Sequence, residues 1–405
     1  MISDRKIRAY ALKNAVSHDG IAMQGPVISS LFSEGLKKRD IKTYAKKINE
    51  IILGVNNLSK EEQKKEFEKI ENELSEREQR EGLPELPNAK KGKVIMRFSP
   101  SPSGPMHIGH ASTGMPSALY VQKYGGKFIL RIEDTNPENI YAPAYKMLKE
   151  EAEWLFGKFC KISKISIQSD RMKIYYSYVE KLIKKKSAYV CTCGQEKFKE
   201  LIDVQKECVC RKNDVKENLR RWKWMLSKKG YNEGEAVLRF KSDVKHKNPA
   251  MRDFPLARIN FAKHPRQGNK YRVWPLMNLA VAVDDIEEKI THSIRAKDHK
   301  DNSERQKMIF KSLGKEKKFP WTAFLGRLNF TDMEISASKT RKAIEEGKYS
   351  GWDDPNLPFI ASLKKRGYRP EAFAKMTIER GISEVDKVIS KEDYFELLDK
   401  FNKMN

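Results

Sequence analysis

The sequence contains no long apolar run and no apolar stretch at its start. No segment approaches the ~20 consecutive apolar residues that a membrane-spanning helix needs. The opening residues, MISDR, lack the apolar core of a secretory signal peptide. These absences exclude a helical membrane protein, and we expect the chain to lie in the cytoplasm without a membrane partner.

Acidic residues and cysteines are also scarce. The chain has 55 Asp and Glu against 80 Lys and Arg, a formal net charge of +25, which indicates a polyanionic partner such as nucleic acid. A lysine-rich proteome would produce the same composition. The chain has only five cysteines, and a reducing compartment disfavours disulfides between them. With 39% hydrophobic residues in 405, the chain has room for two or three domains.

The most informative stretch is RFSPSPSGPMHIGH, residues 97–110. Residues 93–98 are predicted to form a buried strand, the Pro/Ser/Gly run a turn, and His107 onward a helix that ends at Gly125 and Gly126 before a strand at 127–133. Two imidazoles at a helix start could hold an anion such as a triphosphate. An ordinary surface turn with helix-start histidines could have the same H-x-G-H pattern.

Three motifs together point to a family. The RFSPSPSG run, the MHIGH run and RIEDT at 131–135 resemble class I aminoacyl-tRNA synthetases of the glutamyl/glutaminyl group, most closely the archaeal-type glutamyl-tRNA synthetases. The resemblance implies an α/β fold, the class I Rossmann-type nucleotide-binding fold with an inserted acceptor-binding domain. It further implies an N-terminal helical appendage and a C-terminal helical module that contacts the tRNA stem.

The expected domain boundaries follow from this layout and from local composition. Residues 1–90 form the appendage, 91–355 the catalytic domain with an insertion at about 186–265, and 356–405 the helical module. Ser59 to Glu62 is a capping box, which predicts a charged helix running to about Arg80. The Pro/Gly-rich segment 82–92 predicts the first boundary.

The resemblance also assigns site residues. His107, His110 and Lys339 are the expected catalytic residues, with Lys339 in a second phosphate loop at 335–342. ATP, accompanied by Mg²⁺, is expected to bind at the following residues: His107, Gly109, His110, Ser338 and Lys339. L-glutamate is expected among another five: Arg97, Ser101, Glu133, Met277 and Arg295. Met277 stands where bacterial-type relatives place a tyrosine.

The segment after the predicted amino-acid site departs from the family pattern. The apolar run 279–283 is predicted to be strand-like. After Asp284 and Asp285 the family has a His-Leu-Leu-Gly-like turn, whereas this chain has IEEK at 286–289, and Ala296 replaces an expected glycine. We therefore expect an altered loop geometry here.

Two Cys-x-Cys pairs lie in the expected insertion. Four thiolates from Cys191, Cys193, Cys208 and Cys210 could hold a structural Zn²⁺ in a hairpin at 191–210. Four free thiols in a helical hairpin are the alternative. Related enzymes carry a zinc-binding insertion at this place.

Basic and aromatic residues alternate after the cysteines. The sequence RRWKW at 220–224 could neutralise phosphates and stack on the unpaired bases of a tRNA 3′ end. The same pattern would also suit an amphipathic helix that buries Trp222 or Trp224.

The expected activity is ATP-dependent ligation of L-glutamate to tRNA through a glutamyl-adenylate. Alternatives are a glutaminyl-tRNA ligase, an enzyme that glutamylates a tRNA base, and a non-catalytic tRNA-binding subunit. The relatives continue into β-barrel domains that read the anticodon. If this chain contacts only the acceptor arm and inner corner of tRNA, a separate chain could supply those barrels.

Overall fold

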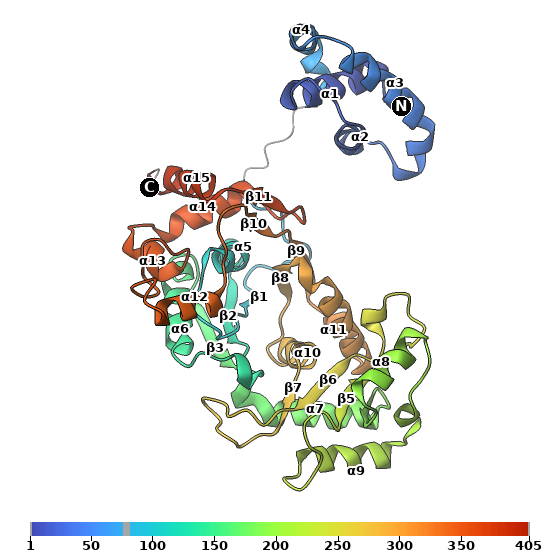
Figure 1. Cartoon of the computed structure of the whole chain (residues 1–405), viewed down its shortest axis with the longest axis vertical. Coiled ribbons are helices and arrows are strands. Elements are labelled where there is room, and N and C mark those ends of the chain that lie inside the picture. Colours follow the sequence, from blue (N-terminus) through green and yellow to red (C-terminus); the bar gives the residue numbers. More distant parts are fainter. Residues whose placement is uncertain (1, 76–81, 404–405) are drawn as a thin grey trace. The chain divides into compact units, whose positions relative to one another are not determined.

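The computed structural model describes residues 2–75 and 82–403, and the chain divides into two compact units, residues 1–80 and 81–405 (Figure 1). The first unit is helical. Its helices are α1 (Asp4–Ser17), α2 (Gln24–Ser33), α3 (Ile41–Asn56) and α4 (Lys60–Ile70), with 3₁₀ turns at Lys38–Asp40 and Glu71–Glu73. They share a core of buried aliphatic side chains that includes Ile7, Leu12, Val27 and Ile48.

The predicted capping box is present, but its helix is shorter than expected. The Ser59 side chain accepts from the Glu62 backbone N–H and the Glu62 carboxylate accepts from the Ser59 backbone N–H. The helix α4 ends at Ile70 rather than near Arg80. None of the described residues that follow, 71–75, packs into the core, and charged residues alone do not extend a helix. Residues 76–81 lie outside the described part of the chain.

The second unit is built on parallel strands. The strands β1 (Val94–Phe98), β2 (Gly126–Ile132) and β3 (Ile162–Ile167) form one parallel sheet in the order β1-β2-β3, and β8 (His292–Ala296) pairs in parallel with β9 (Trp321–Leu325). The backbone N–H of Ile95 donates to Thr291 Oγ1 (2.9 Å), and the N–H of Thr291 donates to the Ile95 carbonyl (3.0 Å). The two sheets thus meet at β1 and β8, the point where the strand order reverses and where ligands of such folds bind.

Helices cover this sheet. They are α5 (Ile108–Tyr124), α6 (Ala144–Phe156), α10 (Met277–Glu287) and α11 (Lys300–Ser312). The expected α/β fold, with the helix after His107 ending at Gly125, is therefore confirmed. Gly125 has a φ of 68°, a backbone conformation in which glycine avoids the steric cost of a Cβ.

A second, antiparallel sheet interrupts the parallel one. Its strands are β4 (Ala188–Cys191), β5 (Val237–Phe240), β6 (Pro255–Ile259) and β7 (Val273–Pro275), with helices α7 (Met172–Lys184), α8 (Gln195–Asp203) and α9 (Val215–Leu226) around it. In α9, Trp222 is fully buried and Trp224 is 44% exposed. The amphipathic helix considered for this stretch is therefore present, and it buries Trp222.

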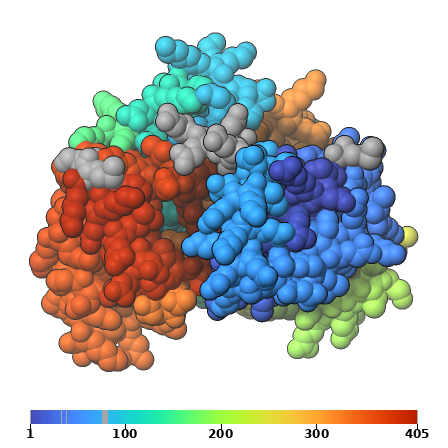
Figure 2. Space-filling model, turned by 90° about the horizontal axis from the view of Figure 1, so that it is seen from above, coloured from blue at the N-terminus to red at the C-terminus, as the bar shows by residue number. Residues whose placement is uncertain are grey.

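The C-terminal part of the chain packs onto the parallel sheet. It contains the parallel pair β10 (Leu328–Phe330) and β11 (Lys387–Ile389) and the helices α12 (Ala337–Glu345), α13 (Ile360–Lys365), α14 (Pro370–Arg380) and α15 (Lys391–Lys403). In Figure 2 the red residues at this end of the chain form one continuous area of surface. Their buried side chains join the same core as α5 and α6. The expected subdivision at residue 355 stays a prediction.

None of the helices in the described residues is long and apolar enough to cross a membrane.

One predicted strand is wrong. Residues 279–283 belong to helix α10, and all five side chains are buried. A helix that is buried on every side reads as a continuous apolar run, so its sequence carries no helical period.

The altered turn after α10 keeps a glycine-like backbone. Lys289, which stands at the glycine of the family pattern, has a φ of 55°, in the left-handed region that disfavours residues with a Cβ by about 1–2 kcal/mol. The sequence change therefore alters the side chains of this turn, while one residue retains the conformation that glycine prefers.

We expect Lys289→Gly to stabilise the protein. Relief of the left-handed strain exceeds the extra chain entropy of glycine, so the free energy of unfolding should rise by about 1 kcal/mol. Urea unfolding followed by fluorescence measures this change. Lys289→Ala is the matched control, because it removes the same charge but keeps the Cβ; a gain of equal size in that variant would contradict the backbone explanation.

Candidate active site

The histidine motif (residues 107–110) lies where β1 passes into α5. His107 is the N-cap of α5, and its Nδ1 accepts from the Gly109 backbone N–H (3.1 Å). His110 Nδ1 accepts from the His107 backbone N–H (3.3 Å), and the two rings stack with centroids 3.9 Å apart. Because both Nδ1 atoms accept, the ring proton of each imidazole must be on Nε2.

The two histidines are neutral. Burial, reinforced by the neighbouring His110, lowers the pKa of His107 well below its usual value, and burial lowers the pKa of His110 to about 4. At neutral pH each ring therefore offers one uncharged Nε2–H donor rather than a positive charge. Such donors at a helix N-terminus suit a phosphate oxygen.

The lysine motif (residues 335–342) touches the turn that leads to the histidines. Ser336 is the N-cap of α12, and a Cβ built on Gly104 would lie 2.6 Å from the Cβ of Ala337. Because two carbon atoms cannot approach so closely, a side chain at position 104 would push the two motifs apart. The structure thus brings both expected phosphate-binding segments together.

Lys339 and Ser338 are exposed on the first turn of α12. The Lys339 ammonium lies 2.7 Å from the Glu334 carboxylate. This exposed ion pair is weak, so a phosphate group could displace Glu334.

Arg97 does not present a free guanidinium edge. Its Nε and Nη2 donate to the two carboxylate oxygens of Asp285 (2.8 and 3.3 Å), and its Nη1 donates to Ser99 Oγ (3.2 Å). Arg97 therefore makes its bidentate carboxylate contact with Asp285, within the protein. Sequence reasoning missed this role, although the adjacent Asp284 and Asp285 after a buried apolar run were a visible signal.

Arg131 is a second buried arginine that sequence reasoning did not assign to the site. Its guanidinium lies 2.8 Å from Asp285 and 2.6 Å from Glu288, and its side chain is fully buried. Although burial alone would raise the pKa of Glu288, Arg131 and Lys164 contribute to holding it below its usual value. Glu288 belongs to the stretch that departs from the family pattern, and here it supplies a negative charge for Arg131.

Arg295 differs from the other two buried arginines. Its Nη1 donates to Gln306 Oε1 (2.7 Å), whose amide donates to Asn278 Oδ1 (3.3 Å). Among the described residues, no carboxylate lies within 4.0 Å of the Arg295 guanidinium. Burial, together with the charge of Arg97, lowers the pKa of Arg295 to about 10, so it remains a cation at neutral pH. A buried cation without a contacting anion is costly, although the more distant Asp285 and Glu133 attract its charge; this cation points to an anionic ligand.

The remaining predicted glutamate-binding residues come from three separate segments of the second unit. Glu133 follows β2, its backbone N–H donates to the Pro100 carbonyl (3.0 Å), and burial raises the pKa of its carboxyl. Met277 begins α10 and is 40% exposed, and Ser101 is exposed in the turn after β1. No hydrogen bond or ion pair between these three side chains occurs in the described structure.

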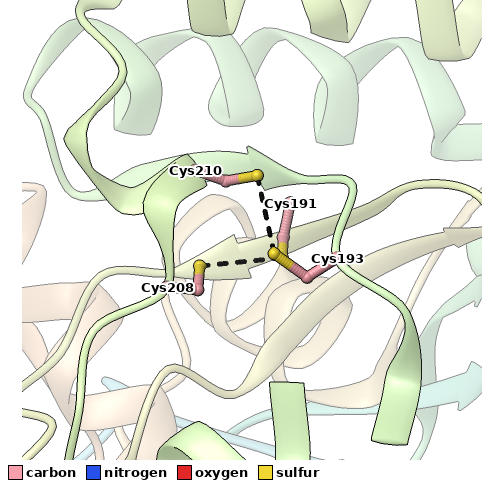
Figure 3. A group of neighbouring side chains, drawn as sticks. All are labelled: Cys191, Cys193, Cys208 and Cys210. Carbon is pink, nitrogen blue, oxygen red and sulfur yellow. Dashed lines mark hydrogen bonds between the residues drawn. The ribbon is translucent and has the colours of Figure 1, made fainter. Parts of the chain in front are cut away.

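The four predicted cysteine ligands meet in space (Figure 3). Cys191 ends β4, Cys193 follows it, and Cys208 and Cys210 lie at the 3₁₀ turn after α8. All four Sγ atoms lie within 4.8 Å of one another, and the pairs Cys191–Cys208 and Cys193–Cys210 are each 3.8 Å apart. Tetrahedral zinc with Zn–S bonds of about 2.3 Å requires S–S distances of about 3.8 Å. The donor set therefore fits zinc.

Comparisons with known proteins agree with this fold. Residues 93–403 match the family described as tRNA synthetases class I (E and Q), catalytic domain. The glutamate–tRNA ligase of Thermococcus kodakarensis is 46% identical over 392 residues, covering 94% of this chain and 67% of the relative. The glutamate–tRNA ligase of Methanobrevibacter smithii is 44% identical over 387 residues, covering 94% and 68%. The chain thus spans about two thirds of the length of these relatives.

A solved structure shows the same fold at lower identity. The glutamate tRNA ligase from Elizabethkingia meningosepticum superposes with a TM-score of 0.53 and 21% identity, over 77% of this chain and 69% of that one. The parallel sheet, the histidine motif at its switch point and the family match agree. The chain therefore belongs to the class I tRNA synthetases of the E and Q group.

Proposed function

We propose that this protein catalyses the ATP-dependent attachment of L-glutamate to tRNA. The observation that carries the amino-acid choice is the buried Arg295 guanidinium, whose hydrogen-bond partner is the neutral amide of Gln306. The side-chain carboxylate of glutamate would neutralise this cation, whereas the amide of glutamine would leave it unpaired. The names of the relatives support the same choice.

The proposed reaction has two steps. The α-carboxylate of glutamate attacks the α-phosphorus of ATP, forming glutamyl-adenylate and releasing pyrophosphate. A ribose hydroxyl at the tRNA 3′ end then attacks the acyl carbon, and AMP leaves. The protein positions the reactants and neutralises charge, because such transfers require little covalent chemistry from it.

Each proposed residue has a defined part in the first step. The Nε2–H groups of His107 and His110 donate to phosphate oxygens, the Gly109 backbone lies against the phosphates, and Lys339 leaves Glu334 to neutralise the departing pyrophosphate. Ser338 lines the same loop. Mg²⁺ bound with ATP would neutralise part of the phosphate charge. The glutamate site is lined by Arg97, Ser101, Glu133 and Met277. In this site the Arg97 guanidinium holds the Asp285 carboxylate in place.

Amino-acid-dependent exchange between ATP and labelled pyrophosphate tests this function. The assay uses the 405-residue protein with glutamate or glutamine, each with and without tRNA. We expect exchange with glutamate but not with glutamine, either with tRNA, without it, or in both cases. Turnover selective for glutamine would establish the glutaminyl alternative. Binding of tRNA without exchange of either amino acid would indicate a tRNA-binding subunit instead.

The four-cysteine cluster is proposed to hold one structural Zn²⁺, for which the thiol spacing provides support. Zinc would tie the end of β4 to the turn after α8 and so stabilise the inserted sheet. The ion has no part in the proposed reaction.

Purified protein is expected to contain about one zinc ion per chain. The double substitution Cys193→Ser/Cys208→Ser should abolish zinc binding, because it removes one ligand from each pair. Mass spectrometry of the metal content measures this. Cys160→Ser is the matched control, since Cys160 lies in the core of the parallel sheet and should not affect zinc. Zinc that persists in the double variant would refute the site.

A further inference from the structure

A cavity lies between helix α5 and the C-terminal part of the chain. Its volume is about 90 Å³, and its walls come from α5, β10, β11, α14 and α15, which lie beside one another in Figure 1. The wall from α5 consists of Ala111 and Ser112, the two residues that follow His110. The residues named for the proposed ATP, glutamate and zinc sites do not line this cavity, here called the α5–α14 cavity.

Most of the wall of the α5–α14 cavity is apolar. It includes four large apolar side chains, those of Leu328, Phe373, Met376 and Leu397. Such a wall suits an apolar group better than ordered water, because a buried water molecule needs two to four polar partners. An engineered cavity of about 150 Å³ holds one benzene molecule, so by proportion this cavity takes a chain of about four carbon atoms.

Tyr394 of α15 brings a hydroxyl group without a partner to this cavity. The residue is 3% exposed and lines the cavity. Within the described part of the chain, its hydroxyl makes no hydrogen bond. A buried hydroxyl that bonds to nothing is costly. The Tyr394 hydroxyl is therefore a donor available to a molecule in the cavity.

Arg380 of α14 brings a cation to the same cavity. Its Nη1 donates to Ser112 Oγ (2.6 Å) and its Nη2 donates to the Gly326 carbonyl (2.5 Å). A guanidinium has five N–H groups, so these two bonds leave donors for a further acceptor. Among the described residues no carboxylate lies within 4.0 Å of this guanidinium, although the more distant Asp386 attracts its charge.

The hydroxyl and the guanidinium lie close enough to influence each other. Burial raises the pKa of Tyr394, and the charge of Arg380 opposes that rise. Burial likewise lowers the pKa of Arg380, and Tyr394 opposes that decrease. The other charged residues that line the cavity, Glu379 and Lys387, are exposed and opposite in sign. The cavity therefore combines an apolar space with one cation and one hydroxyl donor.

We propose that the α5–α14 cavity is a binding site for a small aliphatic carboxylic acid, separate from the sites for ATP and glutamate. The carboxylate of this ligand accepts from the Arg380 guanidinium and the Tyr394 hydroxyl. Its alkyl chain fills the apolar part of the cavity and packs against Met376 and Leu397. This site does not depend on the proposed function, because binding requires neither ATP nor tRNA.

Two methionines allow the site to be tested by nuclear magnetic resonance on the 405-residue protein with isotope-labelled methionine methyl groups. Met376 lines the cavity, and Met277 begins α10 at the proposed glutamate site. Substitution of each by leucine assigns its signal. The probe is pentanoate, whose four-carbon chain matches the cavity. With saturating glutamate present, we expect the Met376 signal to shift and to saturate at millimolar pentanoate, while the Met277 signal does not follow.

Related probes test the chemical class of the ligand. Pentan-1-ol has the same chain without the charge, and it should bind about tenfold or more weakly than pentanoate, because it forms no charge-assisted bond to Arg380. Acetate has three fewer CH₂ groups. Because each buried CH₂ strengthens binding about fourfold, acetate should bind about 60-fold more weakly than pentanoate.

Three variants test the two polar groups. Arg380→Gln removes the cation and should weaken pentanoate binding about tenfold or more. Tyr394→Phe removes only the hydroxyl and should weaken it about threefold or more. Lys400→Gln removes a cation from an exposed position of α15 outside the cavity. It is the matched control for the loss of charge and should leave the affinity unchanged.

A Met376 signal that does not move with pentanoate would overturn the proposal, and so would a shift of Met277 alone. Equal affinity for pentanoate and pentan-1-ol would refute the preference for an acid. If Arg380→Gln does not fold, Tyr394→Phe and the probe series still decide, because they keep the bonds of Arg380 to Ser112 and Gly326. Pentanoate binding at Met376 in a protein that exchanges no pyrophosphate would support this site and contradict only the proposed function.

Discussion

Replacing Arg295 with leucine should reduce kcat/KM for glutamate by about 10²–10³-fold, because the variant removes the buried cation proposed to bind the substrate carboxylate. The KM for ATP should change little, since the histidine and lysine motifs remain. Pyrophosphate exchange measured across glutamate concentrations gives both constants. A decrease of less than threefold would contradict the role of Arg295.

Stability provides a matched control for this substitution. Arg295 has no carboxylate partner within 4.0 Å among the described residues and donates to the neutral amide of Gln306, so Arg295→Leu should lower the unfolding midpoint much less than Arg97→Leu. Arg97→Leu removes the bidentate hydrogen bonds to Asp285 and should destabilise the protein by about 3 kcal/mol. Comparison of the two variants by thermal unfolding separates binding of a ligand from structural ion pairing. Equal destabilisation by both would indicate that Arg295 is also part of the buried network.

A further variant addresses selectivity at the same site. In Gln306→Glu, a carboxylate would replace the amide oxygen that lies 2.7 Å from Arg295. This internal anion would compete with the carboxylate of glutamate and should reduce the preference for glutamate over glutamine. An unchanged preference would argue that another residue selects the amino acid.

Replacing His110 with asparagine should lower the rate of pyrophosphate exchange by about 10²-fold, while tRNA affinity stays nearly unchanged. Asparagine can still accept from the His107 backbone N–H, so the start of α5 is preserved, but it lacks the Nε2–H proposed to donate to phosphate. His110→Gln offers an amide N–H near the Nε2 position and should retain more activity. Equal loss of tRNA binding would contradict the assignment to ATP.

The low pKa of His110 gives this prediction a pH signature. Because burial lowers that pKa to about 4, the ring stays neutral from pH 8 down to about pH 5, and its donor does not change over this range. Between pH 6 and 8, the pH profile of wild-type activity should therefore contain no inflection that is missing from the profile of His110→Gln. If an inflection near pH 6.5 disappeared in His110→Gln, the ring would have to be protonated in the working enzyme, and the neutral-donor role would be wrong.

Local structure at the first turn of α5 could be predicted well from the sequence. The strand, the Pro/Ser/Gly turn, His107 and Gly125 are consecutive in the chain, and each constrains the backbone of its immediate neighbours. The family resemblance also assigned Arg97, Arg295 and both phosphate-binding segments to one site, and parallel strands do bring their carboxyl ends to the same edge of a sheet. The association of the two Cys-x-Cys motifs could likewise be predicted from the sequence, since both supply thiolate ligands.

The sequence alone could not tell where each buried charge finds its partner. Arg97 and Asp285 are 188 residues apart in the chain, and their pairing depends on how β1 packs beside α10, which itself read as a strand because it is buried all round. The same packing leaves Arg295 without a carboxylate and gives Arg131 the unexpected Glu288. Burial makes these pairings decisive for the free energy of folding. In water an ion pair contributes almost no stability, whereas a charge buried away from water is costly unless it is paired. The sequence thus determined which residues are candidates for the chemistry, and the tertiary structure decided which of those charges lack an internal partner.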